Sequence, residues 1–316
     1  AVALLGKALV TPEQLRGQLL SVRDAKAVVV MLVDLTDVSG TLMGTVRDIV
    51  GRNPIVLVGT KMDLLPEGAH PRGVSDWLLE GALRKRLNVV SVHLVSSHSG
   101  EGVAAAVGAV RHERRGRDVF VVGAANVGKS AFVRAMLKEM SRFDGGNFDA
   151  AAMAQAKYLP VESAMPGTTL GVIPLRAFAA GGSLYDTPGV HLHHRVPHML
   201  TPDELRLLHP RRRLAPHVPP SPRELAAEAA GGGDAAGPAG SRGGGGAAPS
   251  AAYEWGGLVR VEVLGAPAPT RLVFYGPPTL RVAAQHMQEQ ESGGVESEAA
   301  QPPGDAPSSL QGGGAA

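Results

Sequence analysis

The sequence has no cysteine among its 316 residues. Within this stretch, that absence excludes disulfides, cysteine-ligated zinc sites and a thiolate-held haem. Aromatic residues are only 4% of the chain, whereas glycine occurs 41 times and proline 24 times. Part of the chain is therefore expected not to pack into a core. No apolar run approaches the ~20 residues of a membrane span, so no integral membrane segment is predicted. The formal net charge of +2 permits a nucleic-acid partner without arguing for one.

Short apolar runs of strand length alternate with segments of helical character. The runs lie at 28–34, 55–59, 89–95 and 118–122, and the helical segments at 41–50, 75–87, 103–112 and from 129 onward. This alternation predicts an α/β fold, with a parallel sheet and helices on both faces. Ligands of such sheets bind at the carboxyl ends of the strands. The polar motifs that follow these strands are therefore the candidate site.

The stretch 118–130, DVFVVGAANVGKS, joins a strand to a helix through a glycine-containing loop that fits the phosphate-binding pattern G-x-x-x-x-G-K-[ST]. Backbone N–H groups of such a loop point at phosphate oxygens, and the helix N-terminus adds partial positive charge. Lys129 is expected to bridge the β- and γ-phosphates, and the Ser130 hydroxyl to ligate Mg²⁺. The predicted nucleotide-binding residues of this loop are Gly123, Ala124, Ala125, Asn126, Val127, Gly128, Lys129, Ser130 and Ala131.

A second motif, TKMD, follows the run at 55–59 and predicts recognition of guanine. The Asp63 carboxylate is placed to accept hydrogen bonds from guanine N1–H and N2–H₂, whereas adenine presents an acceptor there. Lys61 is expected to lay its aliphatic stem along the base. Thr60 stands where the usual N-K-x-D pattern has asparagine, so weaker nucleotide affinity is expected. The loop Ser96, Ser97 and His98 is either a base-supporting loop or a capped turn.

A third group of motifs lies after the phosphate loop. Asp186, Thr187, Pro188 and Gly189 fit D-x-x-G, in which the aspartate holds Mg²⁺ through water and the glycine N–H meets the γ-phosphate. Thr169, or alternatively Thr168, is expected to be the mobile threonine that closes on Mg²⁺. A rival D-x-x-G at 37–40 lacks Thr-Pro and is interpreted as a helix-start turn.

The order of these motifs is unusual, because the guanine motif precedes the phosphate loop and D-T-P-G comes last. A circularly permuted chain can still build the same sheet. The sequence resembles the YqeH-type circularly permuted GTPases, and within them the plant and algal nitric-oxide-associated branch. The resemblance covers roughly residues 25 to 282 and is carried by TKMDLLP, GAANVGKSAF, PGTTLG, LYDTPGVHLHHR and WGGLVRV.

The resemblance implies a GTPase that uses GTP/GDP and Mg²⁺ and assists assembly of the small ribosomal subunit, binding rRNA or pre-ribosomal particles. It implies the chloroplast stroma, with the mitochondrion as the alternative. Asn126 matches the asparagine that helps bind K⁺ in similar GTPases, or it only supports the loop's turn. Val190 stands where many GTPases carry the water-orienting glutamine, so slow intrinsic hydrolysis is expected. The family's usual four-cysteine zinc module is absent from this sequence.

Two further interpretations remain open from the sequence. The basic stretch HPRRR, 209–213, is either a solvated loop or a phosphate contact with RNA. The alternative to an assembly enzyme is a nucleotide-gated scaffold with little hydrolysis that acts on a protein or membrane partner.

The chain is expected to divide into six parts. These are a helical lead-in at 1–24, the permuted GTPase domain at 25–195, a linker at 196–220, a disordered Ala/Gly/Pro-rich insertion at 221–250, a small β-rich segment at 251–284 and a disordered tail at 285–316.

Overall fold

The computed structural model describes residue 17 and residues 22–143, 173–179, 181–190, 199–208, 210–230, 249–266 and 269–287. It divides into two units, Ala1–Val218 with Leu272–Val282 and Pro219–Arg271 with Ala283–Ala316. In the described part of the chain, no helix is both long and apolar enough to cross a bilayer.

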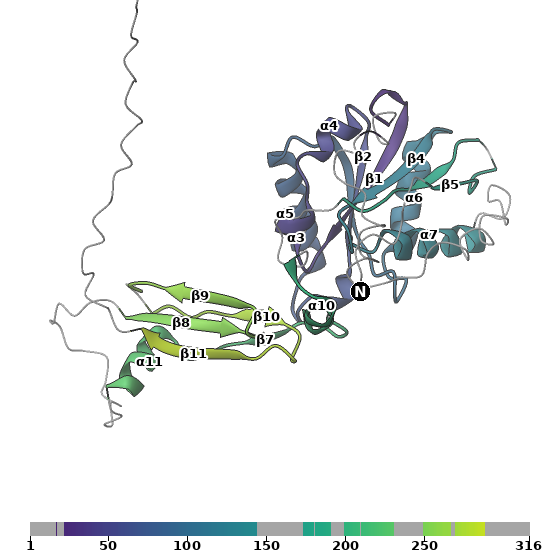
Figure 1. Ribbon diagram of the computed structural model, residues 1–316. Coiled ribbons are helices and arrows are strands. Elements are labelled where there is room, and N and C mark those ends of the chain that lie inside the picture. The colour runs from purple at the N-terminus through teal and green to yellow at the C-terminus, as the bar shows by residue number, and fades with distance from the viewer. Residues whose placement is uncertain are drawn as a thin grey trace, which may run out of the picture. The chain divides into compact units, whose positions relative to one another are not determined.

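The first unit is built on a six-stranded sheet in the order β3-β2-β1-β4-β6-β5 (Figure 1). All neighbours pair in parallel except β5 and β6, which are antiparallel. The strands are β1 Ala27–Asp34, β2 Ile55–Thr60, β3 Val89–Leu94, β4 Asp118–Gly123, β5 Ile173–Leu175 and β6 Leu184–Asp186. The predicted α/β fold with a parallel sheet is confirmed.

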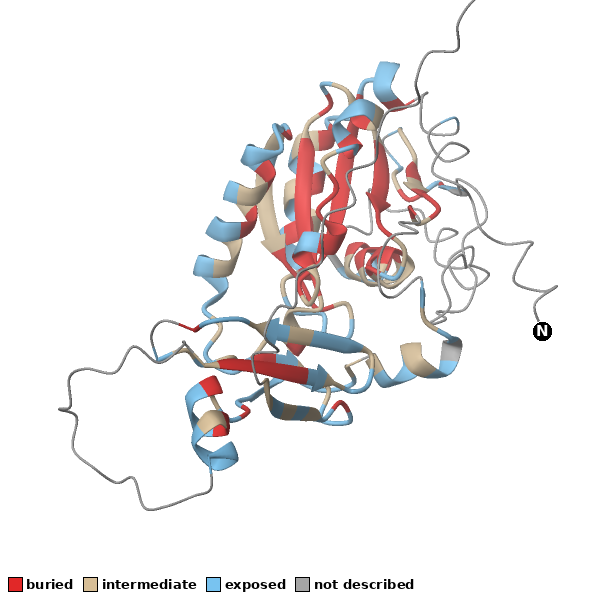
Figure 2. Ribbon diagram, turned by 60° about the vertical axis from the view of Figure 1, so that its left-hand side comes forward, coloured by how far each residue is buried: buried red, intermediate tan, exposed pale blue. Residues whose placement is uncertain are grey.

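Helices cover both faces of this sheet. Figure 1 shows α3 (Val38–Thr41) and α5 (Pro71–Arg84) on one side, and α6 (Val103–Arg114) and α7 (Lys129–Phe143) on the other. Strands β1 and β2 are buried along their whole length, and Figure 2 shows the central strands as the buried layer of the unit. Continuous apolar strands are typical of a sheet covered on both faces.

Some predicted boundaries are wrong. The helix expected at 41–50 is two short helices, α3 and α4 (Val46–Val50), with Gly44 between them, a residue that weakens helices. The helix expected at 75–87 begins earlier, at Pro71, and ends at Arg84. Pro71 occupies a first-turn position, where its missing N–H costs no hydrogen bond.

The segment predicted as a linker, 196–220, contains α10 (Pro202–Leu208) and β7 (Ala215–His217). Strand β7 pairs with β10 (Phe274–Gly276) in a two-stranded sheet of the first unit. Residues 211–213 of the basic stretch are exposed, and residue 209 lies outside the described residues. Most of the lead-in at 1–24 also lies outside them.

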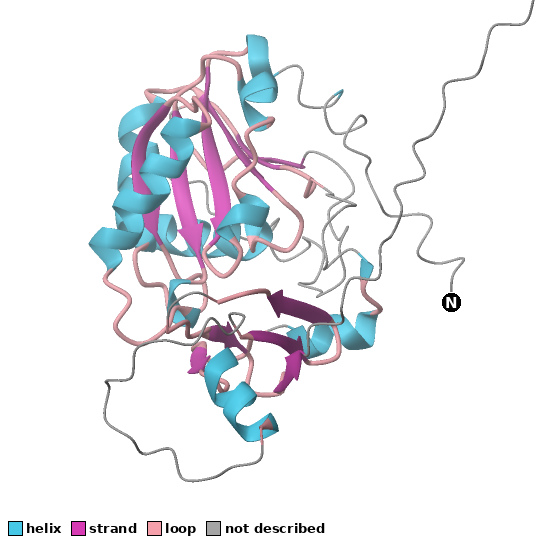
Figure 3. Ribbon diagram, turned by 90° about the vertical axis from the view of Figure 1, so that its left-hand side faces the viewer, coloured by secondary structure: helices cyan, strands magenta, loops and turns pink. Residues whose placement is uncertain are grey.

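The second unit carries a three-stranded sheet, β11-β8-β9, with helix α11 (Figure 3). Strands β8 (Ser250–Trp255) and β9 (Val259–Val263) form a hairpin, and β11 is Val282–Met287. The expected tail from 285 is therefore still in a strand up to residue 287. Tyr253 is fully buried and donates a hydrogen bond to the Pro220 carbonyl at 3.0 Å.

Disorder was predicted from residue 221, but α11 (Pro222–Ala229) occupies the start of that segment. Ser221 and Glu224 form a capping box, in which each side chain accepts a hydrogen bond from the other's backbone N–H. Such a box satisfies two N–H groups that the first helical turn leaves without partners. The local signal S-x-x-E outweighs the low-complexity composition that follows it.

Candidate nucleotide-binding site

Because β1, β2, β3, β4 and β6 are parallel, their carboxyl ends meet at one edge of the sheet. The predicted guanine motif follows β2, the Ser96 loop follows β3, the phosphate loop follows β4, and the D-T-P-G motif begins at the end of β6. Four of the five predicted motifs therefore converge. The fifth, Thr168 and Thr169, lies outside the described residues.

The phosphate loop turns sharply between β4 and α7. Asn126 and Gly128 both have left-handed backbones, with φ of 64° and 88°. Side-chain-free glycine adopts this conformation readily, and asparagine does so more often than most residues. The turn starts α7 at Lys129, and Ala131 follows in its first turn. The loop thereby leads directly into a helix N-terminus, as the motif predicts.

Lys129 is buried, with 7% of its surface exposed, and its Nζ donates a hydrogen bond to the Ala124 carbonyl at 2.8 Å. Burial lowers the pKa of Lys129 to about 8, and the nearby Asp186 carboxylate opposes this shift. An ammonium held out of water in this way gains when an anion is bound beside it. Lys129 is therefore suited to a phosphate ligand.

Asp186 lies at the end of β6 and is fully buried. Its Oδ2 accepts a hydrogen bond from the Ser130 hydroxyl at 3.1 Å, while its Oδ1 has no hydrogen-bond partner among the described residues. Burial raises the pKa of this carboxyl, and Lys129 is the main group that opposes the rise. A hydroxyl and a carboxylate with a spare oxygen form a donor set of the kind Mg²⁺ prefers. Ser130 and Asp186 therefore fit the predicted magnesium role.

The D-T-P-G turn is held against β4. Thr187 Oγ1 donates to the Val121 carbonyl at 2.7 Å. Gly189 approaches the phosphate loop so closely that a Cβ there would lie 2.7 Å from Ala125 Cα and 2.9 Å from Lys129 Nζ. Only glycine fits this position. Pro188 lies between these two anchors.

Val190 extends the contact between the two motifs. Its N–H donates to the Gly123 carbonyl at 3.1 Å, and its own carbonyl accepts from Ala125 N–H at 2.9 Å. These two bonds fasten the chain that leaves the D-T-P-G motif to the start of the phosphate loop. The motifs are thus joined by backbone hydrogen bonds as well as by Asp186 and Ser130.

The guanine motif forms a tight turn after β2. Thr60 is buried and its hydroxyl lies 2.7 Å from the Val127 carbonyl, to which it donates. Lys61 has φ 63°, and Asp63 lies in the 3₁₀ helix η1 (Met62–Leu64) that follows. The Asp63 side chain is half-buried. Thr60 thereby ties the predicted base-recognition turn to the phosphate loop, a contact that the sequence motif does not reveal.

The loop after β3 is adjacent to this turn, because Met62 N–H donates to the Val95 carbonyl at 3.1 Å. Ser96 is buried, and its Oγ accepts from Ser99 N–H at 3.1 Å. The capped-turn interpretation of this loop is therefore correct, and its position beside η1 is also compatible with base support. Ser97 is half-buried and His98 exposed.

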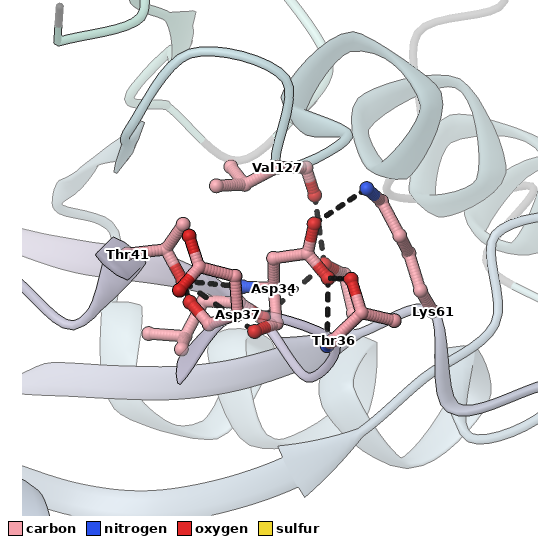
Figure 4. Close-up of polar contacts among 8 residues, drawn as sticks. Asp34, Thr36, Asp37, Thr41, Lys61 and Val127 are labelled. Atoms are coloured by element: carbon pink, nitrogen blue, oxygen red, sulfur yellow. Dashed lines mark hydrogen bonds and ion pairs between the residues drawn. The ribbon is translucent and has the colours of Figure 1, made fainter. Parts of the chain in front are cut away.

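The rival motif at 37–40 is a helix start, as interpreted. Asp37 caps α3 and accepts from Gly40 N–H at 2.9 Å. Just before it, Asp34 forms an ion pair with Lys61, with 2.5 Å between Oδ2 and Nζ (Figure 4). Asp34 was not among the predicted site residues. Its position at the end of a buried strand, like that of the other motifs, is the signal that identifies it.

Comparison with known proteins shows which curated proteins the chain resembles. No family model matches the sequence. The chain is 44% identical over 282 residues to "NO-associated protein 1, chloroplastic/mitochondrial" of Arabidopsis thaliana, covering 88% of this chain and 47% of the relative. It is 36% identical over 195 residues to "Uncharacterized protein YqeH" of Bacillus subtilis, covering 62% of this chain and 50% of that protein. The predicted resemblance to YqeH and to the plant NO-associated proteins is confirmed.

The identity to plant proteins is higher than the identity to YqeH. A rice relative named "Putative nitric oxide synthase" is also 44% identical, over 277 residues, covering 88% of this chain and 46% of the relative. The chain spans about half the length of these plant relatives. Among solved structures, YjeQ from Thermotoga maritima is similar with a TM-score of 0.30 and 21% identity, covering 52% of this chain and 48% of that chain; an overlap this low supports no inference about function.

Proposed function

We propose that this protein binds GTP and Mg²⁺ and hydrolyses GTP to GDP and phosphate. The observation that carries the proposal is the convergence of the buried Lys129 and Asp186 with Ser130, whose hydroxyl lies 3.1 Å from the Asp186 carboxylate. The turn that carries Asp63 is tied to the same loop through Thr60. Lys129 would neutralise phosphate charge, and Gly189 N–H would meet the γ-phosphate. The resemblance to the YqeH-type GTPases supports the same chemistry.

Each residue has a defined part in the proposed reaction. Ser130 and Asp186 would hold Mg²⁺, with Thr169 or Thr168 closing on it. The ion, when bound, neutralises charge on the β- and γ-phosphates. Val190 has an aliphatic side chain, and its backbone is fastened to the phosphate loop. It cannot orient an attacking water, so hydrolysis by the protein alone should be slow.

Potassium ion is proposed to supply part of the missing transition-state stabilisation, with Asn126 as a ligand. A cation beside the phosphates would neutralise developing charge. GTP turnover at equal ionic strength should be on the order of tenfold faster in KCl than in NaCl, and Asn126→Ala should remove the difference. Steady-state phosphate release measures both.

Asn126→Gly is the matched control, because glycine retains the left-handed backbone that φ 64° requires. If Asn126 serves only the turn, the glycine variant keeps its response to potassium. Equal turnover of the unsubstituted protein in both salts would contradict the proposal.

We further propose that the GTPase assists assembly of the small ribosomal subunit in the plastid, with the mitochondrion as the alternative compartment. The compartment is supported by the Arabidopsis relative's name, "chloroplastic/mitochondrial". The ribosomal role is supported by the family resemblance, and the exposed arginines at 211–213 offer charge for phosphate contacts with rRNA.

Sedimentation with ribosomal subunits tests this role. The protein should pellet with small subunits in the presence of a non-hydrolysable GTP analogue several-fold more than with GDP, and the subunits should stimulate GTP turnover. Arg84→Ala removes an exposed arginine of α5, away from the stretch 211–213. It is the control and should pellet like the unsubstituted protein. Pelleting that ignores the nucleotide, together with unstimulated turnover, would favour a nucleotide-gated scaffold for another partner.

A further inference from the structure

Lys61 occupies a backbone conformation that a lysine rarely adopts. Its φ of 63° and ψ of 34° are left-handed, where the Cβ of an L-residue crowds the following carbonyl oxygen. Such a conformation persists when the surrounding structure fixes it. The turn also determines where Asp63 lies, because Lys61 directly precedes η1. Whatever holds Lys61 therefore also positions the predicted base-recognition carboxylate.

Asp34 supplies that restraint. It ends β1 directly beside Thr60 in the parallel register. Its carboxylate is bound on both oxygens: Oδ2 accepts from Lys61 Nζ at 2.5 Å, and Oδ1 accepts from Thr36 N–H at 2.9 Å and Thr36 Oγ1 at 2.7 Å (Figure 4). The carboxylate cannot swing away from Lys61 without losing the bonds to Thr36.

The pair is shielded from water, with 18% of the Lys61 side chain and 10% of the Asp34 side chain exposed. Removing one member of a shielded ion pair leaves the other charge uncompensated, which is much more disruptive than losing a surface pair. The backbone beneath the pair is also fixed, because Leu35 N–H donates to the Thr60 carbonyl at 3.2 Å and Asp34 N–H to Thr41 Oγ1 at 2.9 Å.

We propose that Asp34 is a positioning residue for guanine-nucleotide binding, which acts by holding Lys61 and hence the turn that carries Asp63. The inference rests on the proposed function. Because this contact is on the base side of the site, its loss should weaken GTP and GDP binding equally. Substitution of a residue on the phosphate side of the site would instead change the ratio of the GTP affinity to the GDP affinity.

The test is Asp34→Asn, which keeps the shape of the side chain and removes its charge. Affinities for GTP and GDP should both fall about tenfold, with their ratio unchanged, as measured by calorimetric titration. Asp37→Asn is the matched control, because that residue caps α3 in the same loop by accepting from Gly40 N–H, and asparagine caps equally well. Its affinities should stay within about twofold of the unsubstituted protein.

A double-mutant cycle distinguishes positioning from a general structural role. In a Lys61→Met background, Asp34→Asn should cause no further loss of affinity. An equal loss with and without the lysine ammonium would overturn the inference. Should Asp34→Asn fail to fold, Thr36→Val serves instead, because it removes one of the two hydrogen bonds on Asp34 Oδ1. GTP and GDP affinities should then fall a few fold, and only when Lys61 is present.

The outcomes also separate this inference from the proposed function. A protein that binds GTP normally after Asp34→Asn overturns the inference alone. An unsubstituted protein that binds no guanine nucleotide overturns the proposed function and this inference with it.

Discussion

Lys129→Met is expected to reduce GTP affinity by at least about 100-fold while the protein remains folded. The Lys129 ammonium is buried near the Ala124 carbonyl and Asp186. The loop 123–130 has no other positively charged side chain. Loss of the ammonium removes the main compensation for phosphate charge. Calorimetric titration with GTP measures the change.

The stability of the same variant provides an independent check. Burial lowers the pKa of Lys129 to about 8, which means that keeping the ammonium in the nucleotide-free protein costs free energy. Methionine has a similar length and removes this cost, but it also leaves the buried Asp186 carboxylate without its main compensating charge. These effects oppose each other, so the midpoint of thermal unfolding should change little. Lys138→Met, at an exposed position of the same helix, is the control and should bind GTP normally. Normal binding by Lys129→Met would refute the assignment of the phosphate loop.

Asp63→Asn is expected to exchange guanine for xanthine as the preferred base. The carboxylate would accept from guanine N1–H and N2–H₂, whereas an amide presents one acceptor and one donor, and xanthine has a carbonyl where guanine has its amino group. GTP affinity should fall on the order of 100-fold or more, since a site built for specific hydrogen bonds rejects a partner that leaves them unmade. Xanthosine triphosphate should bind the variant better than GTP does.

Competition between the two nucleotides for a fluorescent analogue measures this exchange. Asp76→Asn, in α5, makes the same chemical change on an exposed surface and should leave base preference unaltered. If Asp63→Asn retains the preference for GTP, or if the unsubstituted protein prefers ATP, the assignment of the guanine motif is wrong.

The sequence predicts the sheet well, because its strands are continuous apolar runs between polar turns. Residues 28–34 and 55–59 coincide with β1 and β2 to within a residue. The phosphate loop and D-T-P-G were predictable for another reason: their chemistry requires a few residue types at fixed spacing. In the sheet, β4, which leads into the phosphate loop, lies between β1 and β6. This arrangement agrees with the permuted order of the motifs in the sequence.

Contacts between motifs were less predictable, since no local pattern encodes them. The bond from Thr60 to the Val127 carbonyl joins residues 67 positions apart. Asp34 is 27 positions from Lys61, and an aspartate at a strand end more often caps a turn than fixes a distant lysine. Composition also misled at α11, where glycine and alanine further along obscured the capping box.

The strand order has a consequence for synthesis of the chain. Strands β1, β2 and β3 are neighbours in the sheet and consecutive in the sequence, so all their mutual pairings are available once residue 94 has left the ribosome. The edge of β1 that pairs with β4 then stays open until β4 emerges at residues 118–123. The side chains of β1 are apolar apart from its last residue. An open apolar edge recruits strands from other chains. Self-association of the nascent protein should therefore be greatest while α6 is emerging from the ribosome, before β4 and the phosphate loop have emerged.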